Sequence, residues 1–522
     1  MLINLLALLQ APLPTPANTP RPAHDAIHYA ITIDIPDSGR RITGEVDTRW
    51  RLLSSDPIRV ELDSAFEVVE IRVGRAQVRW RRADDVLSFP TGRQAGDTVT
   101  TFIRYAGVPR DGLVIRDSAG ARTAFADNWP NRAHRWFPSQ DHPSDKATVS
   151  FQVTVPHGYQ VIANGALIST RSLGPALDQW GYRTDHPIPV YTMVVGVARF
   201  ARTAAGNAGC AVRCVPVAVW TYPADSAWAV GGPFRRAREI VDFFTGLVGD
   251  FPYSGLTHVQ SSTIFGGMEN STAIFYDEAA YSNRRLTEGT VAHETAHQWF
   301  GDAVTEREWP HLWLSEGFAT YFDGLWVEHI GGDSALQGYM RGQARGIYRD
   351  SVTEHPIVDS TGDLMDLLNS NNYNKGAWVL HSLRGLLGDS LFFKGIGAYY
   401  RAFRDSTALS EDFQKVMETA AGRDLAWYFK QALHQPGYPV VEFTSRYDST
   451  AHRLTLRFRQ VQKPAWGTYR LPGLEILVDS LLVRVDLDSP MEELTFDQFA
   501  QAPREIRVDP NAWWLLEVRT LR

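Results

Sequence analysis

The spacing of the apolar residues changes twice along this chain, and these changes constrain its fold more than any other feature. From about Ala26 to Phe200 apolar residues alternate with polar ones or form short runs between turn residues, as in HYAITIDI and ATVSFQVTVP. This pattern is typical of β-strands. From Ser226 the apolar residues recur with helical spacing, as in LWLSEGFATYFDGLWVEHI. Pro and Gly in HQPGYP, residues 434–439, end the helical part, and strand-like spacing returns after them.

These changes predict a multidomain α+β protein. With 522 residues the chain is long enough for about three domains. We expect a large N-terminal β domain, a mostly helical domain with a short β portion, and a small C-terminal β-sandwich. The predicted boundaries are 1–22 for a leader or linker, then 23–203, 204–437 and 438–522. We expect no large helical domain after the sandwich.

The composition excludes several classes of protein. With 44% apolar and 21% charged residues, the chain is expected to be globular rather than disordered. A formal charge of -7 offers no basic field for phosphate backbones, so nucleic acid is not an expected partner. The apolar run MLINLLALLQ is too short to span a membrane, and no other run is longer, so no transmembrane segment is expected. The same run favours export to the periplasm or the medium, and a cytoplasmic location is the alternative.

The chain has two cysteines, Cys210 and Cys214, close together in GCAVRCVPV. A local disulfide is our preferred interpretation, and it would fit an oxidising compartment. Two free thiols in a cytosolic enzyme are the alternative. A metal site is the least favoured interpretation, because no further Cys or His lies nearby at ligand spacing.

The segment HETAH, residues 293–297, indicates a metal site. Residues four apart share one face of a helix, so His293 and His297 can present their imidazoles to the same ion. A catalytic zinc needs a third protein ligand, and Glu316 lies nineteen positions after His297 in the next segment with helical spacing. We therefore expect one Zn²⁺ per chain. A chance match on an amphipathic helix is the alternative for HETAH alone.

The residues around this site predict hydrolysis. Glu294 lies beside the histidines and can accept a proton from water, then return it to a leaving amine. A phenol hydroxyl can stabilise an oxyanion without adding charge, and Tyr373 in NNYNKGAWVL is a candidate. Its spacing does not distinguish it from the other tyrosines.

With these motifs in order, the chain resembles the zinc aminopeptidases of peptidase family M1, the group containing aminopeptidase N and leukotriene A hydrolase. The matching segments are GGMEN, HETAHQWFGDAVT, WLSEGFATY and YNKGAW, with support from WFPSQDHPSDKATVSFQVTVP and GYPVV. The resemblance covers nearly all of the chain after the linker. It implies a thermolysin-like catalytic domain, peptide substrates with a free N-terminus, and Tyr373 as the oxyanion donor. Tyr276 and Tyr281 remain candidates for packing.

The resemblance also gives GGMEN a role in binding substrate. It implies that the glycines let a peptide backbone approach closely and that the glutamate binds the substrate's α-ammonium. Without the resemblance, paired glycines predict only a turn before a strand. The five residues are Gly266, Gly267, Met268, Glu269 and Asn270.

The chain departs from the family pattern in two places. Family members often carry a Gln or Glu just before the segment that matches AHRWFP, and here Trp129 stands at about that position, beside Asn128. We consider Asn128 as a hydrogen-bonding partner of the ammonium, or the Trp129 ring as a cation–π partner. Many relatives continue into a large helical domain that covers the active site. Without it we expect an open site, or one closed by another subunit.

Other functions remain open at this point. The same scaffold could belong to an endopeptidase or to a lipid epoxide hydrolase, and a catalytically inactive binding protein is a candidate from a different class. Asp323, seven residues after Glu316, could orient a zinc ligand or be a solvated helix carboxylate. His311 is expected to be a packed or surface histidine, since it has no partner at ligand spacing. The oligomeric state is not predicted.

Overall fold

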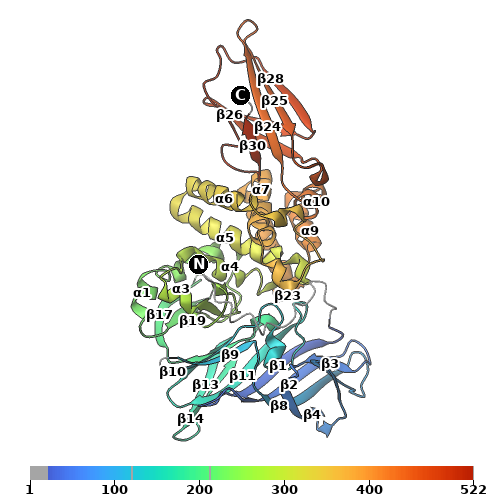
Figure 1. Cartoon of the computed structure of the whole chain (residues 1–522), viewed down its shortest axis with the longest axis vertical. Helices are drawn as coiled ribbons and strands as arrows, with labels where there is room; N and C mark the ends of the chain where they lie inside the picture. Colours follow the sequence, from blue (N-terminus) through green and yellow to red (C-terminus); the bar gives the residue numbers. More distant parts are fainter. Residues whose placement is uncertain (1–21, 119–120, 211–212, 521–522) are drawn as a thin grey trace. The chain divides into compact units, whose positions relative to one another are not determined.

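The computed structural model describes residues 22–118, 121–210 and 213–520 (Figure 1). Of the predicted leader or linker at 1–22, all but Pro22 lies outside the described residues. The chain forms two compact units. Of the described residues, the first comprises 22–309, Asp363–Met365 and Tyr400–Ala408, and the second comprises Pro310–Gly362, Asp366–Tyr399 and 409–520. The boundaries predicted from the sequence, at 23–203, 204–437 and 438–522, are not tested by this division and stay predictions.

The N-terminal part of the first unit is rich in β-structure, as predicted. Strands of its largest sheet pair in the order β13-β14-β11-β1-β2-β8-β4-β5, with β15 paired to β11. In β2, Ile42, Val46 and Trp50 are fully buried, and exposed or half-buried residues separate the buried positions. Alternation of this kind buries one face of a strand against the core. The strands are β1 (Asp25–Asp34), β2 (Ile42–Arg51), β4 (Phe66–Val73), β5 (Ala76–Gln77), β8 (Thr98–Gly107), β11 (Lys146–Pro156), β13 (Ala166–Ser172), β14 (Leu177–Arg183) and β15 (Ile188–Pro189).

Two smaller sheets complete this β-rich part. A four-stranded sheet has the order β12-β16-β10-β9, and a three-stranded sheet has the order β3-β7-β6. Their strands are β3 (Ile58–Glu61), β6 (Arg81–Ala83), β7 (Val86–Phe89), β9 (Leu113–Ser118), β10 (Ala121–Ala126), β12 (Gln160–Ala163) and β16 (Val195–Ala198).

A five-stranded sheet follows, and it carries the GGMEN segment. Its order is β17-β18-β19-β21-β20, so β20 lies at the edge. This sheet is larger than the short β portion expected from the sequence, because the segments before and after the first helices also pair into it. Its strands are β17 (Ala201–Ala208), β18 (Val215–Thr221), β19 (Leu256–Ser261), β20 (Gly267–Met268) and β21 (Ala273–Asp277), and a separate pair joins β22 (Val304–Glu306) to β23 (Ser406–Ala408).

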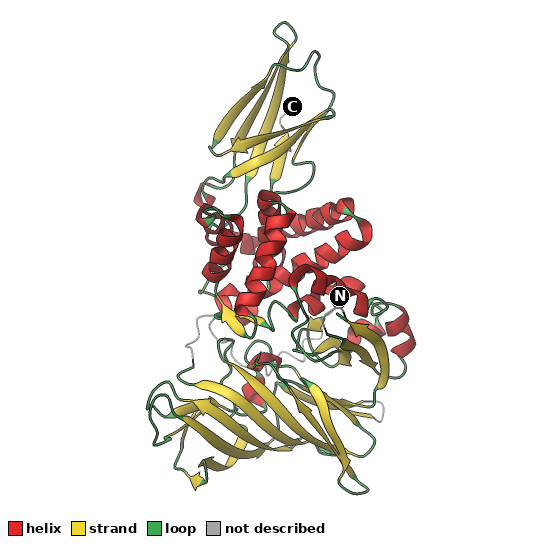
Figure 2. Cartoon of the chain, turned by 180° about the vertical axis from the view of Figure 1, so that it is seen from behind, coloured by secondary structure: helices red, strands yellow, loops and turns green. Residues whose placement is uncertain are grey.

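The helical spacing after Ser226 corresponds to helices in the structure (Figure 2). Nearly every residue of α5 between Trp313 and Trp326 is buried, so this helix is enclosed by other parts of the protein. The helices are α1 (Ser226–Gly231), α2 (Ala237–Val248), α3 (Glu278–Ser282), α4 (Glu288–His297), α5 (Trp313–Gly331), α6 (Asp333–Ile347), α7 (Gly376–Leu387), α8 (Asp389–Phe403), α9 (Ser410–Ala421) and α10 (Ala426–His434). None of the helices in the described part of the chain is long and apolar enough to cross a membrane.

The last part of the described chain returns to strands, as the sequence predicts. Two sheets form there, with the orders β28-β25-β24-β30 and β27-β26-β29. Their strands are β24 (Val440–Asp448), β25 (Arg453–Gln460), β26 (Leu471–Val478), β27 (Leu481–Leu487), β28 (Met491–Phe496), β29 (Ile506–Val508) and β30 (Glu517–Thr520).

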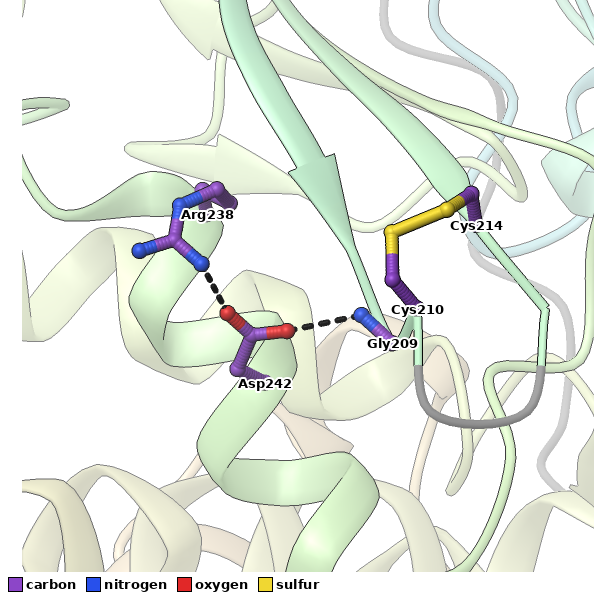
Figure 3. The surroundings of a disulfide bond; sticks show 5 residues. All are labelled: Gly209, Cys210, Cys214, Arg238 and Asp242. Carbon is purple, nitrogen blue, oxygen red and sulfur yellow. Dashed lines mark hydrogen bonds and ion pairs between the residues drawn. A yellow bond between two sulfur atoms is a disulfide. The ribbon is translucent and has the colours of Figure 1, made fainter.

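The two cysteines form the disulfide that the sequence favoured (Figure 3). Next to it, the backbone N–H of Gly209 donates to Asp242 of α2 at 2.7 Å, and Arg238 pairs with the same carboxylate. The residue before the disulfide is therefore tied to α2 by a hydrogen bond.

Candidate functional site

Helix α4 places two histidines on one face. It starts at the N-cap Thr287, whose side chain accepts a hydrogen bond from the backbone of Thr290. The Nε2 atoms of His293 and His297 lie 3.2 Å apart. Nδ1 of His297 lies 3.1 Å from the carbonyl oxygen of Phe300. Because only a protonated Nδ1 can donate to a carbonyl, Nε2 keeps its lone pair for a metal ion.

Glu316 supplies a carboxylate to the same set of ligands. It is 4% exposed and lies in the first turn of α5. The ligand atoms that His293, His297 and Glu316 offer all lie within 4.8 Å of one another. Two imidazoles and one carboxylate are a donor set that suits zinc and leaves a fourth position for water or substrate.

A second group of side chains gathers around His297. Ligand atoms of Glu269, Glu294 and His297 also lie within 4.8 Å of one another. Glu269 is 5% exposed and Glu294 is 6% exposed. Two buried carboxylates this close repel one another and have lost most of their hydration, so the cluster favours cations. A metal ion and a substrate ammonium are cations of suitable size.

The strand β20 explains one of the two glycines. A Cβ atom on Gly267 would lie 2.2 Å from Oε1 of Glu294, which is an impossible contact, whereas a Cβ on Gly266 would meet nothing within 4 Å. Gly267 therefore lets the Glu294 carboxylate lie against the strand. From the sequence, both glycines were predicted to let the substrate backbone approach closely. The contact between Gly267 and Glu294 was missed because only the fold brings β20 and α4 together.

Among the described strands, β20 is paired on one side only. Gly267 pairs with Tyr276 and Met268 with Phe275, both on β21, and β20 is the last strand of its sheet. Met268 is buried, so it anchors the strand to the core. Unpaired backbone groups on an edge strand can form hydrogen bonds with an extended peptide.

Gln298 is a residue that the sequence interpretation missed. Its Oε1 accepts from the backbone of Thr272 at 2.8 Å, and its Nε2 donates to the carbonyl of Glu269 at 3.0 Å and to Asp302 at 2.8 Å. Gln298 thus ties the end of α4 to the segment that carries Glu269. Burial raises the pKa of Asp302 well above its usual value, and the nearby Glu269 adds to this effect. The position of Gln298 directly after a metal-binding histidine was the available signal.

Asn128 and Trp129 have different surroundings from each other. The Asn128 amide donates to the carbonyl of Met193 at 2.7 Å and accepts from the Trp136 indole at 2.8 Å. We infer that Asn128 supports the fold of this segment. Trp129 is 2% exposed and makes edge-to-face contacts with Phe265 and Trp309. Its ring therefore lies beside the residue that precedes GGMEN.

Asn270, the last residue of GGMEN, is fully buried. Neither its side-chain oxygen nor its side-chain nitrogen has a hydrogen-bond partner within the described residues. Buried amides without partners are rare. A role for Asn270 in binding substrate stays a prediction from the resemblance.

Tyr373 lies in a π-helical turn, Asn371–Lys375, directly before α7. This turn is held against α5 by two glycines. A Cβ on Gly317 would lie 2.8 Å from the backbone of Gly376, and a Cβ on Gly376 would lie 2.9 Å from that of Gly317. Because Gly317 follows Glu316 directly, the glycine contact fixes the distance between the turn with Glu316 and the turn with Tyr373.

The other polar candidates are packed within the protein. His311 is 7% exposed, with Nδ1 2.8 Å from the Ser410 hydroxyl, in agreement with the packed interpretation. Asp323 accepts a hydrogen bond from the Tyr339 hydroxyl at 2.9 Å. Tyr276 and Tyr281 are fully buried, as expected for packing residues.

Comparison with known protein families agrees with this geometry. Residues 26–192 match the Peptidase M1 N-terminal domain, and residues 241–431 match the Peptidase family M1 domain. The β-rich N-terminal domain is therefore followed by a catalytic domain of the M1 type.

Curated relatives carry aminopeptidase names. The chain is 25% identical over 481 residues to probable aminopeptidase 1 of Sulfurisphaera tokodaii, covering 88% of this chain and 59% of the relative. It is 28% identical over 352 residues to glutamyl aminopeptidase of Bitis rhinoceros, covering 64% of this chain and 36% of the relative. The chain thus spans about three fifths or less of the length of these relatives.

Solved structures share the fold. Aminopeptidase A of Legionella pneumophila, in complex with aspartic acid, superposes with a TM-score of 0.84 at 16% identity, over 96% of this chain and 60% of that one. An M1 zinc metallopeptidase of Deinococcus radiodurans superposes with a TM-score of 0.72 at 23% identity, over 80% of this chain and 95% of that one. The resemblance seen in the motifs is confirmed by the two matching domains, and the chain belongs to peptidase family M1.

Proposed function

We propose that this chain is a zinc-dependent aminopeptidase that hydrolyses the first peptide bond of peptides with a free N-terminus. The observation that carries the proposal is the close group of Glu269, Glu294 and His297. A carboxylate beside the hydrolytic residues is what recognition of an α-ammonium requires. The names of the curated relatives support the same activity. A Deinococcus radiodurans M1 zinc metallopeptidase variant is described with a bound Tyr-Ser-Ala substrate, which supports peptides as the substrate class.

The substrate would bind as an extended strand. Its backbone would pair with the free edge of β20, and its ammonium would bind the Glu269 carboxylate. Both the ammonium and the carboxylate lose hydration in a buried site, so each needs the other. A substrate with a blocked N-terminus would leave Glu269 without its cation and would bind poorly.

His293, His297 and Glu316 would hold the zinc ion. When bound, zinc supplies a Lewis acid that polarises the scissile carbonyl and makes water more acidic. Glu294 would accept a proton from the attacking water and then donate it to the leaving amine. Gly267 determines the position of the Glu294 carboxylate, because any larger residue would displace it.

Tyr373 would donate a hydrogen bond from its hydroxyl to the oxyanion that forms on the scissile carbonyl. Such a bond is strongest in the transition state, when the oxygen carries its full charge. Trp129 would close the side of the ammonium pocket next to Phe265, where its ring can also contact a cation.

The experiment that tests the proposal compares free and N-acetylated versions of one peptide, and amino-acid arylamides. The zinc-loaded protein should release single residues from the free substrates only. Replacing Glu269 with Gln keeps the shape and removes the charge, and should lower kcat/KM for free substrates by about 100-fold. Equal rates on free and acetylated peptides would show an endopeptidase instead.

Removal of the metal is a second test. Dialysis against a chelator should abolish hydrolysis, and stoichiometric zinc should restore it. The variant His297→Ala should lose bound zinc as measured by atomic absorption. Full activity in metal-free protein would contradict the role of the ion.

We also propose that the protein works in an oxidising compartment. The Cys210–Cys214 disulfide supports this location, because such bonds persist outside the reducing cytosol. Thiol labelling of the protein isolated from its native cells should find both cysteines oxidised. Labelling of both thiols would favour the cytoplasm.

A further inference from the structure

The second unit contains a cavity that is not part of the site described above. Its volume is about 60 Å³. One wall is formed by Lys375 and the first turns of α7, and the others by residues of α10, the segment before β24, and the C-terminal sheets. The side chains that carry the argument are Lys375, Trp378, Tyr428, Tyr438, Tyr469 and Trp514.

Lys375 is the charged residue of this cavity. It is 5% exposed, and within the described residues its hydrogen bond is a long one, with Nζ 3.4 Å from the carbonyl oxygen of Gln435. None of the residues lining the cavity is an aspartate or a glutamate. Burial lowers the pKa of Lys375 to about 7. A buried ammonium has three donors to satisfy, and one carbonyl at this distance satisfies one of them weakly.

Trp378 provides a second donor without an acceptor. It lies three positions after Lys375 on the same face, it is 3% exposed, and its indole Nε1 has no hydrogen-bond partner among the described residues. An indole N–H can only donate. Two of the residues that line the cavity therefore carry donors that are not fully satisfied, and one of these residues is cationic.

Two tyrosine hydroxyls of the cavity wall donate to backbone carbonyls. The hydroxyl of Tyr428 donates to the carbonyl of Val379 at 2.6 Å, and that of Tyr469 donates to the carbonyl of Pro436 at 2.6 Å. These two rings, with those of Tyr438 and Trp514, give the cavity a largely aromatic wall. A ligand that fits must accept two hydrogen bonds, carry negative charge, and present an apolar remainder to the rings.

We propose that this cavity binds a small organic carboxylate, whose oxygens accept hydrogen bonds from Lys375 Nζ and Trp378 Nε1. A carboxylate pairs with a buried ammonium through charge-assisted hydrogen bonds and offers lone pairs to the indole as well. A single water needs about 10–15 Å³ of such space, so the cavity has room for an acid of a few heavy atoms, such as butyrate. This proposal does not depend on the peptidase activity.

Thermal unfolding of the full zinc-loaded chain tests the proposal. Acetate, propionate and butyrate are added at constant ionic strength, with chloride as the ionic control and butyramide as a neutral molecule of similar shape. We expect butyrate to raise Tm saturably by about 2 °C at high occupancy, and butyramide to leave it unchanged.

Three variants locate the binding. Lys375→Met keeps the length of the side chain and removes the charge, and it should abolish the shift. Trp378→Phe should weaken butyrate binding about tenfold, as measured by calorimetry. Lys415→Met is the matched control, because Lys415 is an exposed lysine on α9, and it should bind as the wild type does.

Two results would overturn the proposal. The first is an equal butyrate shift in Lys375→Met, which would mean that the acid binds elsewhere, for example at the zinc. The second is the absence of any shift in the wild type. If Lys375→Met does not fold, Trp378→Phe decides the question, since wild-type affinity in that variant would exclude the indole contact.

Discussion

The two units position their reactive residues by different glycine contacts. In the first unit, Gly267 on β20 faces a side chain, and its missing Cβ leaves room for the Glu294 carboxylate. In the second unit, Gly317 on α5 faces the backbone of Gly376 at the start of α7. One contact sets where a single carboxylate lies, and the other sets the distance between two helices.

This difference separates catalysis from stability. A flexible carboxylate can move away from an added methyl group, so a larger residue at position 267 should displace the base and leave the fold intact. Two helix backbones cannot move without disturbing the packed residues around them. A larger residue at position 317 should therefore affect folding as well as activity.

The largest effect is expected from Glu294→Gln. This substitution removes the proposed base of the first unit, and the new side chain has nearly the same volume and still fits against Gly267. We expect kcat to fall by about 1000-fold, because the amide cannot accept the proton of water. Zinc content, measured by atomic absorption, should stay the same. Retained turnover would assign the proton transfer to another group.

Tyr373→Phe removes from the second unit the hydroxyl that is proposed to donate to the oxyanion. We expect kcat to fall by about 100-fold with little change in KM, because the hydroxyl acts mainly in the transition state. Steady-state kinetics with one arylamide measure both constants. A change confined to KM would show that Tyr373 binds substrate and does not stabilise the oxyanion.

Gly317→Ala tests the contact between the helices. The added Cβ would lie 2.8 Å from the Gly376 backbone, and overpacking of this kind costs about 1–3 kcal/mol. We expect a lower Tm together with an activity loss of about tenfold, because Glu316 and Tyr373 both depend on this distance. Calorimetry and kinetics on the same sample measure the two effects. If activity falls while Tm stays the same, the Gly317 contact would affect catalysis alone, as is expected for Gly267, and the two contacts would not differ.

Gly267→Ala and Gly266→Ala together test the contact in the first unit. If Gly267 makes room for Glu294, Gly267→Ala should lower activity by about tenfold without a change in Tm. Gly266→Ala should have a smaller effect, since its Cβ would meet nothing within 4 Å. If both glycines instead allow the peptide backbone to approach β20, the two variants should raise KM equally. Kinetics with a tripeptide distinguish these outcomes.

Much of the site could be predicted from the sequence because its ligands lie on regular elements. Helical spacing puts His293 and His297 on one face, and the next helical segment offers Glu316. The resemblance to family M1 added Glu269 as a candidate for binding substrate and Tyr373 as a candidate oxyanion donor, and these roles stay predictions. The sequence interpretation did not find the clamp made by Gln298, because its partners Thr272 and Glu269 lie far from it along the chain.

The sequence by itself determined the kind of chemistry, the order of strand-rich and helical segments, and the residue types that hold a metal. These properties follow from local spacing, which repeats every two residues in strands and every 3.6 residues in helices. Only the tertiary structure decided what Gly267 and Gly317 make room for, and that Lys375 has one long hydrogen bond and the Trp378 indole no acceptor within the described residues. Such facts depend on which surfaces meet, and side chains distant in sequence meet only when the chain packs.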